Sequence, residues 1–271
     1  MRLPIIVTLI AAAALPAPPD PAVIGLDHIP IAVSDLARAA DDYRALGFAL
    51  KPGRPHDNGI QNQHVKFTDG TELELITAPD ARDALTTTYR RHLEQGDGPA
   101  FLALFAPRML YAEEQLRAAT LTLPSYIFLS GRNKSPTDLP EHFAHANTAE
   151  SFISVWLAAD DLSRERRLLD VLGATFTDAD VLAPTKVRAK VARLKEGDVV
   201  FLPGSRQLVN GRRIVGATLR VGSLDKARAI LDRGQPSPLP IVTSAAGRSV
   251  FLPPERAHGL WLEFREVRRS S

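Results

Sequence analysis

Two imidazoles and two carboxylates occur at strand-like spacing near the start of the chain. His28 lies in the run 26–33, where Ile29 and the alternate residues after it are apolar. Glu72 and Glu74 alternate with leucines in a later run, which His64 precedes. Because alternate residues of a strand point to one face of a sheet, these side chains are expected to converge on one concave surface.

Such a group of side chains predicts either a metal centre or a polar cavity. Two imidazoles and a carboxylate, here His28, His64 and Glu74, suit a divalent metal with open coordination positions. The ion would act as a Lewis acid on a carbonyl or enediolate oxygen, and a carboxylate would move a proton. In this interpretation His28 and Glu74 are the catalytic residues. The alternative is a metal-free cavity in which His28 is only hydrogen-bonded, and His56 lies in a loop beside it.

The elements that position these residues belong to a unit that recurs along the chain. Residues 33–48, 159–174 and 221–234 each contain an apolar run, a polar cap and an amphipathic helix that closes on glycine. A weaker copy begins near residue 100. This repetition predicts an α+β fold built from four partly degenerate copies of one unit. An active site is expected on the sheet face that the helices leave uncovered.

The first copy shows a local signal for each of its elements. Residues 36–46 have apolar side chains at helical spacing, a capping residue at 34 or 35 precedes them, and Gly47 ends them. Residues 63–77 are predicted to form a hairpin around Asp69-Gly70. Helices are also expected within 79–95 and 110–121, strands at 100–106, 189–194, 199–202, 248–252 and 260–265, and an irregular loop at 131–145.

Several stretches resemble a known family. Residues 26–33, the helix ending at Leu46-Gly47-Phe48, and residues 70–76 are similar to the opening of a glyoxalase-like domain of the vicinal oxygen chelate superfamily. Residues 145–147 and 258–264 are similar to other pieces of it. The resemblance covers most of residues 25–267 and is most specific in the first copy.

The resemblance implies βαβββ units that pair into two lobes, 26–148 and 152–267, whose curved sheets enclose a cavity. It also implies that His28 and Glu74 occupy metal-ligand positions, because metal-dependent members take ligands from the first and last strands of a unit. The expected function is lyase, isomerase or dioxygenase chemistry on a small organic molecule in the first lobe. The expected cofactor is Zn, Fe, Mn or Ni, or no metal at all. The alternative function is metal-free sequestration of a small molecule.

The later copies lack most of these polar residues. The positions that match His28 hold Phe101, Ser154 and Gly216. Only the carboxylate of Glu74 recurs, as Glu263 in the last copy. A full set of family ligands is therefore absent from both lobes, unless His142 or His145 supplies one from the loop between them.

The second lobe is expected to offer a different surface. Its concave face would carry Trp156, Arg220, Trp261 and Glu263, and we expect these residues to bind substrate. Aromatic and arginine side chains suit a planar or anionic small molecule. Ordinary core packing of the tryptophans is the other interpretation. A purely architectural second lobe, which supports the first lobe or a dimer, is a further alternative.

Composition and the first residues limit the compartment and the partners. Residues 1–17 have a basic start, a short apolar core and a small-residue exit, which predicts a signal peptide followed by a linker at 18–25. A periplasmic or secreted location follows, although a disordered apolar start on a cytoplasmic protein would look similar. The absence of cysteine excludes disulfides and thiol catalysis.

Charge gives no reason to expect a polyanionic partner. The net charge is only +2 over 271 residues. The basic residues in 186–195 alternate with apolar ones, which is typical of a strand with one solvated face. We therefore expect a small-molecule substrate or ligand, no nucleic acid, and no membrane once the signal is removed. A homodimer is left open.

Overall fold

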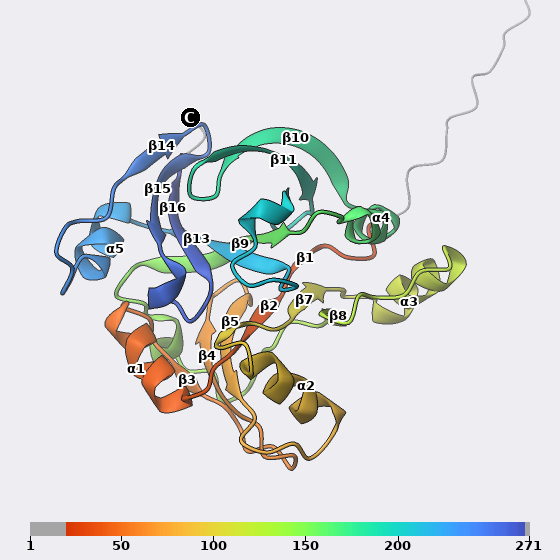
Figure 1. The fold of residues 1–271 in the computed structure, drawn as a ribbon, viewed down its shortest axis with the longest axis horizontal. Coiled ribbons are helices and arrows are strands. Elements are labelled where there is room, and N and C mark those ends of the chain that lie inside the picture. Colours follow the sequence, from red (N-terminus) through yellow and green to blue (C-terminus); the bar gives the residue numbers. More distant parts are fainter. Residues whose placement is uncertain (1–19, 269–271) are drawn as a thin grey trace, which may run out of the picture.

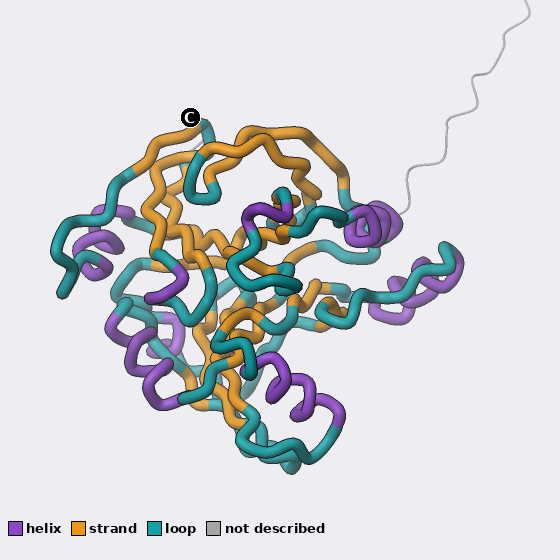
Figure 2. Tube along the Cα trace, in the orientation of Figure 1, coloured by secondary structure: helices purple, strands orange, loops and turns teal. Residues whose placement is uncertain are grey.

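The computed structural model describes residues 20–268, which form five α-helices and three β-sheets (Figures 1 and 2). The predicted signal peptide, 1–17, lies outside these residues. Within the described range, no helix is long and apolar enough to cross a bilayer. The α+β class expected from the sequence is confirmed.

The first copy folds as its local signals predict. Its elements are β2 (His28–Ala32), α1 (Leu36–Ala45), β3 (Lys51–Pro52), β4 (Gln61–Lys66) and β5 (Glu72–Thr77). The Asp35 carboxylate accepts a hydrogen bond from the Arg38 N–H and caps α1. Gly47 follows the helix with φ of +87°, a conformation that favours glycine. Strand β2 runs parallel to β5 at the centre of a sheet ordered β3-β4-β5-β2-β6.

The second copy is shorter than the first. It contains β6 (Gly98–Pro99), β7 (Leu102–Phe105), α3 (Met109–Ala118) and β8 (Ile127–Ser130), and β1 (Gly25–Leu26) completes a sheet ordered β1-β7-β8. Only one strand follows its helix. The linking helix α2 (Ala84–Leu93) packs Tyr89 against Ile60 and Ile76 instead. One end of the face that was expected to be free of helices is therefore covered.

The second lobe forms one sheet from two complete copies. The first comprises β9 (Ala149–Ala158), α4 (Ser163–Val171), β10 (Thr175–Leu182), β11 (Lys186–Arg193) and β12 (Asp198–Leu202). The other comprises β13 (Ile214–Val221), α5 (Leu224–Leu231), β14 (Val242–Ser244), β15 (Gly247–Leu252) and β16 (Trp261–Val267). The order is β10-β11-β12-β9-β13-β16-β15-β14, and β10 and β11 curl over the sheet (Figure 1).

The basic residues of β11 pair with acidic residues of neighbouring strands. The Lys186 ammonium lies 2.8 Å from the Asp180 carboxylate, and that of Lys190 lies 3.0 Å from the Asp178 carboxylate. Both acids belong to β10, an edge strand that the sequence analysis did not predict, because its polar residues obscure the strand pattern. The charge of the basic run is thus partly neutralised within the sheet.

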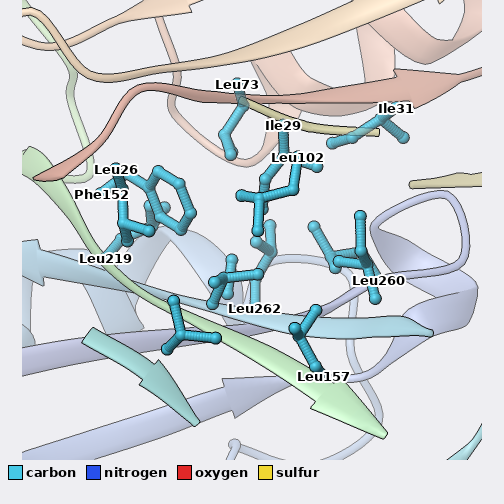
Figure 3. Packing of buried hydrophobic residues seen from close by; sticks show 14 of the residues in the cluster. Leu26, Ile29, Ile31, Leu73, Leu102, Phe152, Leu157, Leu219, Leu260 and Leu262 are labelled. Atoms are coloured by element: carbon cyan, nitrogen blue, oxygen red, sulfur yellow. The ribbon is translucent and has the colours of Figure 1, made fainter. Parts of the chain in front are cut away.

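One hydrophobic core joins the two lobes (Figure 3). Ile29 and Leu73 of the first lobe belong to the same buried cluster as Leu157 and Leu262 of the second. The predicted linker also belongs to this core: Ala22 and Val23 are buried, and their N–H groups donate to the Leu172 carbonyl. The helix-facing sides of the sheets are therefore used for packing, and the His28 side is left for chemistry.

Candidate functional site

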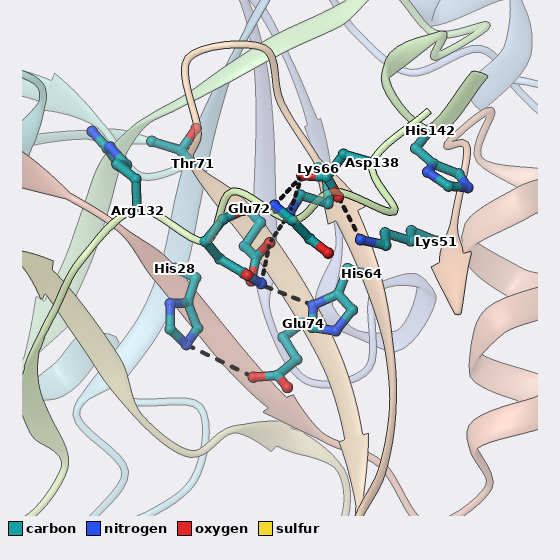
Figure 4. Close-up of polar contacts among 12 residues, drawn as sticks. His28, Lys51, His64, Lys66, Thr71, Glu72, Glu74, Arg132, Asp138 and His142 are labelled. Atoms are coloured by element: carbon teal, nitrogen blue, oxygen red, sulfur yellow. Dashed lines mark hydrogen bonds and ion pairs between the residues drawn. The ribbon is translucent and has the colours of Figure 1, made fainter. Parts of the chain in front are cut away.

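A cavity of about 700 Å³ opens on the polar face of the first lobe. His28, His64, Glu72 and Glu74 line it from three adjacent strands, and loops 51–56 and 130–137 form its rim. The four side chains that the sequence analysis placed on one face do meet here (Figure 4).

The His28 imidazole is held by its neighbour in sequence. Its Nδ1 lies 2.6 Å from Oδ1 of Asp27, which is 0% exposed, and its Nε2 lies 3.8 Å from Oε2 of Glu74. Strand pairing breaks at Asp27, between β1 and β2, which lets this carboxylate turn toward the ring. Burial lowers the pKa of His28, but the bond to Asp27 and the charges of Glu74 and Glu72 outweigh it and raise the pKa above 6.5. Because Asp27 engages Nδ1, Nε2 is the ring nitrogen that is directed toward Glu74 in the cavity.

The two glutamates have different partners. The Asn62 amide donates to Oε1 of Glu74 at 2.6 Å, so one carboxylate oxygen is engaged and the other faces His28. Glu72 lies 3.3 Å from Nδ1 of His64 and 3.7 Å from the ammonium of Lys66. Burial raises the pKa of Glu72, but the contact with His64, the charge of His28 and the Asn133 amide outweigh it and lower the pKa. Glu72 is thus an ionised anchor, and Glu74 is the carboxylate beside the free imidazole nitrogen.

A carboxylate from the rim connects the cavity loop to the sheet. Asp138 lies 2.5 Å from the Lys51 ammonium and 3.0 Å from that of Lys66. Burial raises the pKa of Asp138, but the two lysines and the Ser135 N–H outweigh it and lower the pKa to about 2. Asp138 therefore keeps its negative charge at neutral pH and holds the loop over the sheet.

The two loop histidines act within the backbone rather than in the cavity. Nδ1 of His142 accepts from the Leu139 N–H at 3.0 Å. Nδ1 of His145 accepts from the Ala49 N–H, and its Nε2 bonds the Lys66 carbonyl at 2.9 Å. Burial lowers the pKa of His145, which favours this neutral ring. Neither residue lines the cavity, so neither supplies a ligand there.

Asp27 and Arg132 are functional residues that the sequence analysis missed. The Arg132 guanidinium donates to the Leu26 carbonyl, lies 2.6 Å from the Glu196 carboxylate, and lies 3.8 Å from that of Asp27. Asp27 could have been noticed as a charge within an apolar run. Arg132 carried no local signal. It connects the cavity loop to a turn of the second lobe.

The donor set does not fit a resident metal ion. Within residues 20–268, no three His, Cys, Asp or Glu side chains are arranged to hold one. His28 and Glu74 face each other, but Nδ1 of His64 is turned toward Glu72, whose carboxylate already has the Lys66 ammonium beside it. Among the described residues, no third side chain therefore joins His28 and Glu74 in a metal-ligating arrangement.

The second copy has aromatic residues at the positions that match His28 and Glu74. Ile29 pairs with Leu73 as Leu102 pairs with Ile127, so Phe128 stands where the first copy has Glu74. The Phe128 ring meets the His28 imidazole edge-on, with 5.4 Å between centroids. Phe101 packs against Phe128 in turn. An aromatic wall thus faces the His28–Glu74 pair.

The structure separates the four residues expected to bind substrate in the second lobe. Glu263 is 0% exposed, and its carboxylate accepts hydrogen bonds from Thr218, Ser249 and Arg265. Arg220 pairs with Glu150 at 3.3 Å in a different surface hollow. Trp156 and Trp261 line a third pocket together. A single site built from all four is therefore absent from the described residues.

The ionisation of His28 provides a test of this geometry. Replacing Asp27 by asparagine removes the charge that favours the imidazolium and leaves its burial, so we expect the pKa of His28 to fall. Because the folded-state pKa of the wild type exceeds 6.5, the imidazolium's contribution to stability is complete below that pH. It is lost as the pH rises through the folded-state pKa. Histidine-ring NMR titration of both proteins measures the change, and an unchanged pKa would contradict the Asp27 contact.

Comparisons with known proteins agree with this architecture. Residues 26–137 match the family model described as a glyoxalase-like domain. No curated protein matches the chain significantly. A triple mutant of 4-hydroxymandelate synthase from Streptomyces coelicolor is similar, with 12% identity and a TM-score of 0.61 over 93% of this chain and 94% of that one.

Two further solved structures share the fold. The 2,3-dioxygenase LapB from Pseudomonas sp. KL28 has 14% identity and a TM-score of 0.61, over 92% of this chain and 94% of that one. A xylose isomerase-like TIM barrel/4-hydroxyphenylpyruvate dioxygenase fusion protein has 12% identity and a TM-score of 0.60 over 94% of this chain. The present chain spans only 51% of that fusion protein. At these identities the likeness concerns the fold.

Proposed function

Because residues 26–137 match a glyoxalase-like domain, we propose that the first-lobe cavity of this chain binds a small organic molecule. We further propose that His28 exchanges a proton with that molecule. The observation that carries this proposal is the imidazole held at Nδ1 by buried Asp27, with Nε2 directed into the cavity beside Glu74.

The proton transfer follows from the two forms of the ring. In the neutral ring the proton stays on Nδ1, where Asp27 accepts it, and the lone pair of Nε2 faces the bound molecule. Abstraction of a proton next to a carbonyl would then produce the imidazolium, which Glu74 and Asp27 stabilise. Return of the proton to a neighbouring atom completes an isomerisation. This chemistry requires the neutral ring, so the rate is expected to rise as the pH passes the pKa of His28.

The experiment uses pyruvate as a probe and follows exchange of its methyl protons for solvent deuterium by NMR. General base catalysis contributes about 10²–10⁴-fold, so wild type should exceed His28→Ala by a factor in this range. His142→Ala is the matched control, because His142 only caps a loop N–H outside the cavity. Equal rates for wild type and His28→Ala would contradict the proton-transfer proposal. The proposed proton transfer uses no metal ion. A rate that is lost on adding a chelator and restored by added metal would therefore contradict it.

Sequestration without turnover is the second candidate function. The observation that favours it is the aromatic packing behind the His28 ring, where Phe128 meets the imidazole edge-on and Phe101 packs against Phe128, because these side chains hold the imidazole and add no reactive group. Saturable binding that survives a chelator, without deuterium exchange in the bound molecule, would support sequestration. The two functions share one cavity and differ only in whether His28 reacts.

A further inference from the structure

The second lobe contains a pocket of its own, separate from the His28 cavity. Its volume is about 310 Å³, and both tryptophans of the chain line it. Leu202 and Val215 add apolar surface, and Arg206 lies at the same pocket. We call it the tryptophan pocket. Small-molecule sites usually measure about 300–1,000 Å³, so this pocket suits a compact molecule with one ring.

Three neighbouring strands build the aromatic side of the tryptophan pocket. In register, Gly216 of β13 lies between Trp156 of β9 and Trp261 of β16. A Cβ atom at residue 216 would lie 2.1 Å from the Trp156 ring, so the missing side chain makes room for the indole. The Trp156 Nε1–H donates to Thr218 and fixes the ring. Trp261 is only half-buried, so one indole is anchored and the other remains accessible.

A cation without a counter-charge accompanies these rings. Arg206 lies in a short 3₁₀ turn, Gly204–Arg206, and is half-buried. Its guanidinium donates to the Ala183 carbonyl and to the Thr185 hydroxyl at 2.8 Å, both of which are neutral. No carboxylate within residues 20–268 forms an ion pair with it. A partly desolvated guanidinium is satisfied best by a carboxylate, which it binds with two parallel hydrogen bonds.

We propose that the tryptophan pocket binds a small aromatic carboxylate. Its ring would pack against Trp156 and Trp261, and its carboxylate would pair with Arg206. Offset or edge-on contacts between aromatic rings favour a flat apolar body over a flexible chain. This site uses none of the residues of the His28 cavity, so it stands or fails independently of the function proposed above.

Tryptophan emission reports on this pocket alone, because the chain has only two tryptophans and both line it. The experiment titrates the full-length protein with benzoate and, in parallel, with benzamide, its neutral isostere. We expect a saturable change in emission with benzoate. The apparent affinity for benzamide should be weaker than that for benzoate by at least roughly tenfold. His28→Ala should bind benzoate as the wild type does. Loss of benzoate binding in that variant would contradict a separate site.

Two variants test the named contacts. Arg206→Gln should reduce benzoate affinity to the level of benzamide, whereas Arg188→Gln, on the exposed face of β11, should leave it unchanged. Trp261→Leu should weaken binding roughly twofold to tenfold and leaves Trp156 as the reporter. Circular dichroism and unliganded emission verify that each variant is folded. A lack of saturable response to benzoate in the wild type, or wild-type affinity in Arg206→Gln, would overturn the proposal.

Discussion

Replacing Arg132 by methionine is expected to lower the free energy of unfolding by about 1–3 kcal/mol, because it removes the cation beside buried Asp27 and a hydrogen bond to the Leu26 carbonyl, and leaves only His28 to pair with Asp27. Asp27 is 0% exposed, and the side chain of Arg132 is only 9% exposed. Methionine keeps much of the apolar contact of the side chain with the Phe105 ring, whose centroid lies 4.3 Å from the guanidinium carbon. The loss would therefore come from the charge and its hydrogen bonds. Urea denaturation of both proteins gives the difference.

Arg108→Met is the matched control for this substitution. Arg108 also stacks on an aromatic ring, that of Tyr111 at 4.5 Å, but its side chain is 51% exposed. Exposed ion pairs contribute about 0–1 kcal/mol, so this change should have little effect. Similar losses for both variants would show that stacking dominates and that the pairing of Arg132 with Asp27 and Glu196 is unimportant.

Replacing Glu263 by glutamine is expected to destabilise the second lobe by about 3 kcal/mol, because hydrogen bonds to a buried charge would be lost. Arg265 donates to both carboxylate oxygens at 2.9 and 2.7 Å, and the hydroxyls of Thr218 and Ser249 also donate. An amide has one oxygen acceptor and presents its NH₂ group to the remaining donors. Thermal and urea unfolding report the change.

Glu255→Gln is the corresponding control. Glu255 is exposed, and such surface changes usually stay within about 0.5 kcal/mol. If Glu263→Gln retained wild-type stability, the carboxylate would not be a structural anchor. The interpretation of Glu263 as a buried connector between β13, β15 and β16 would then be wrong.

The fold was predictable from the sequence where its signals are local. Three features depend on neighbouring residues, and the structure confirms them: the cap of α1, which was predicted at residue 34 or 35 and is Asp35, the glycine after that helix, and the hairpin around Asp69-Gly70. The face that carries His28 follows from strand alternation in the same way. These features require no knowledge of the rest of the chain.

Long-range contacts could not be predicted in this way. The pairing of Arg132 with Asp27 and Glu196 joins three distant segments, and no spacing rule relates them. Helix α2 was expected, but its position, which packs Tyr89 against Ile60 and Ile76, depends on the strands that the second copy lacks. The separation of Glu263 from the tryptophan pocket depends on which buried donors surround the carboxylate.

The core that unites the lobes bears on how this protein can change over evolutionary time. A gene that lost the second half would produce a first half whose Ile29 and Leu73 faced water rather than Leu157 and Leu262. A first half with such an exposed apolar surface would tend to aggregate. Selection would therefore retain the second half even if that half bound no ligand. Because the first half needs it for packing, the second half would persist long enough to acquire a ligand of its own.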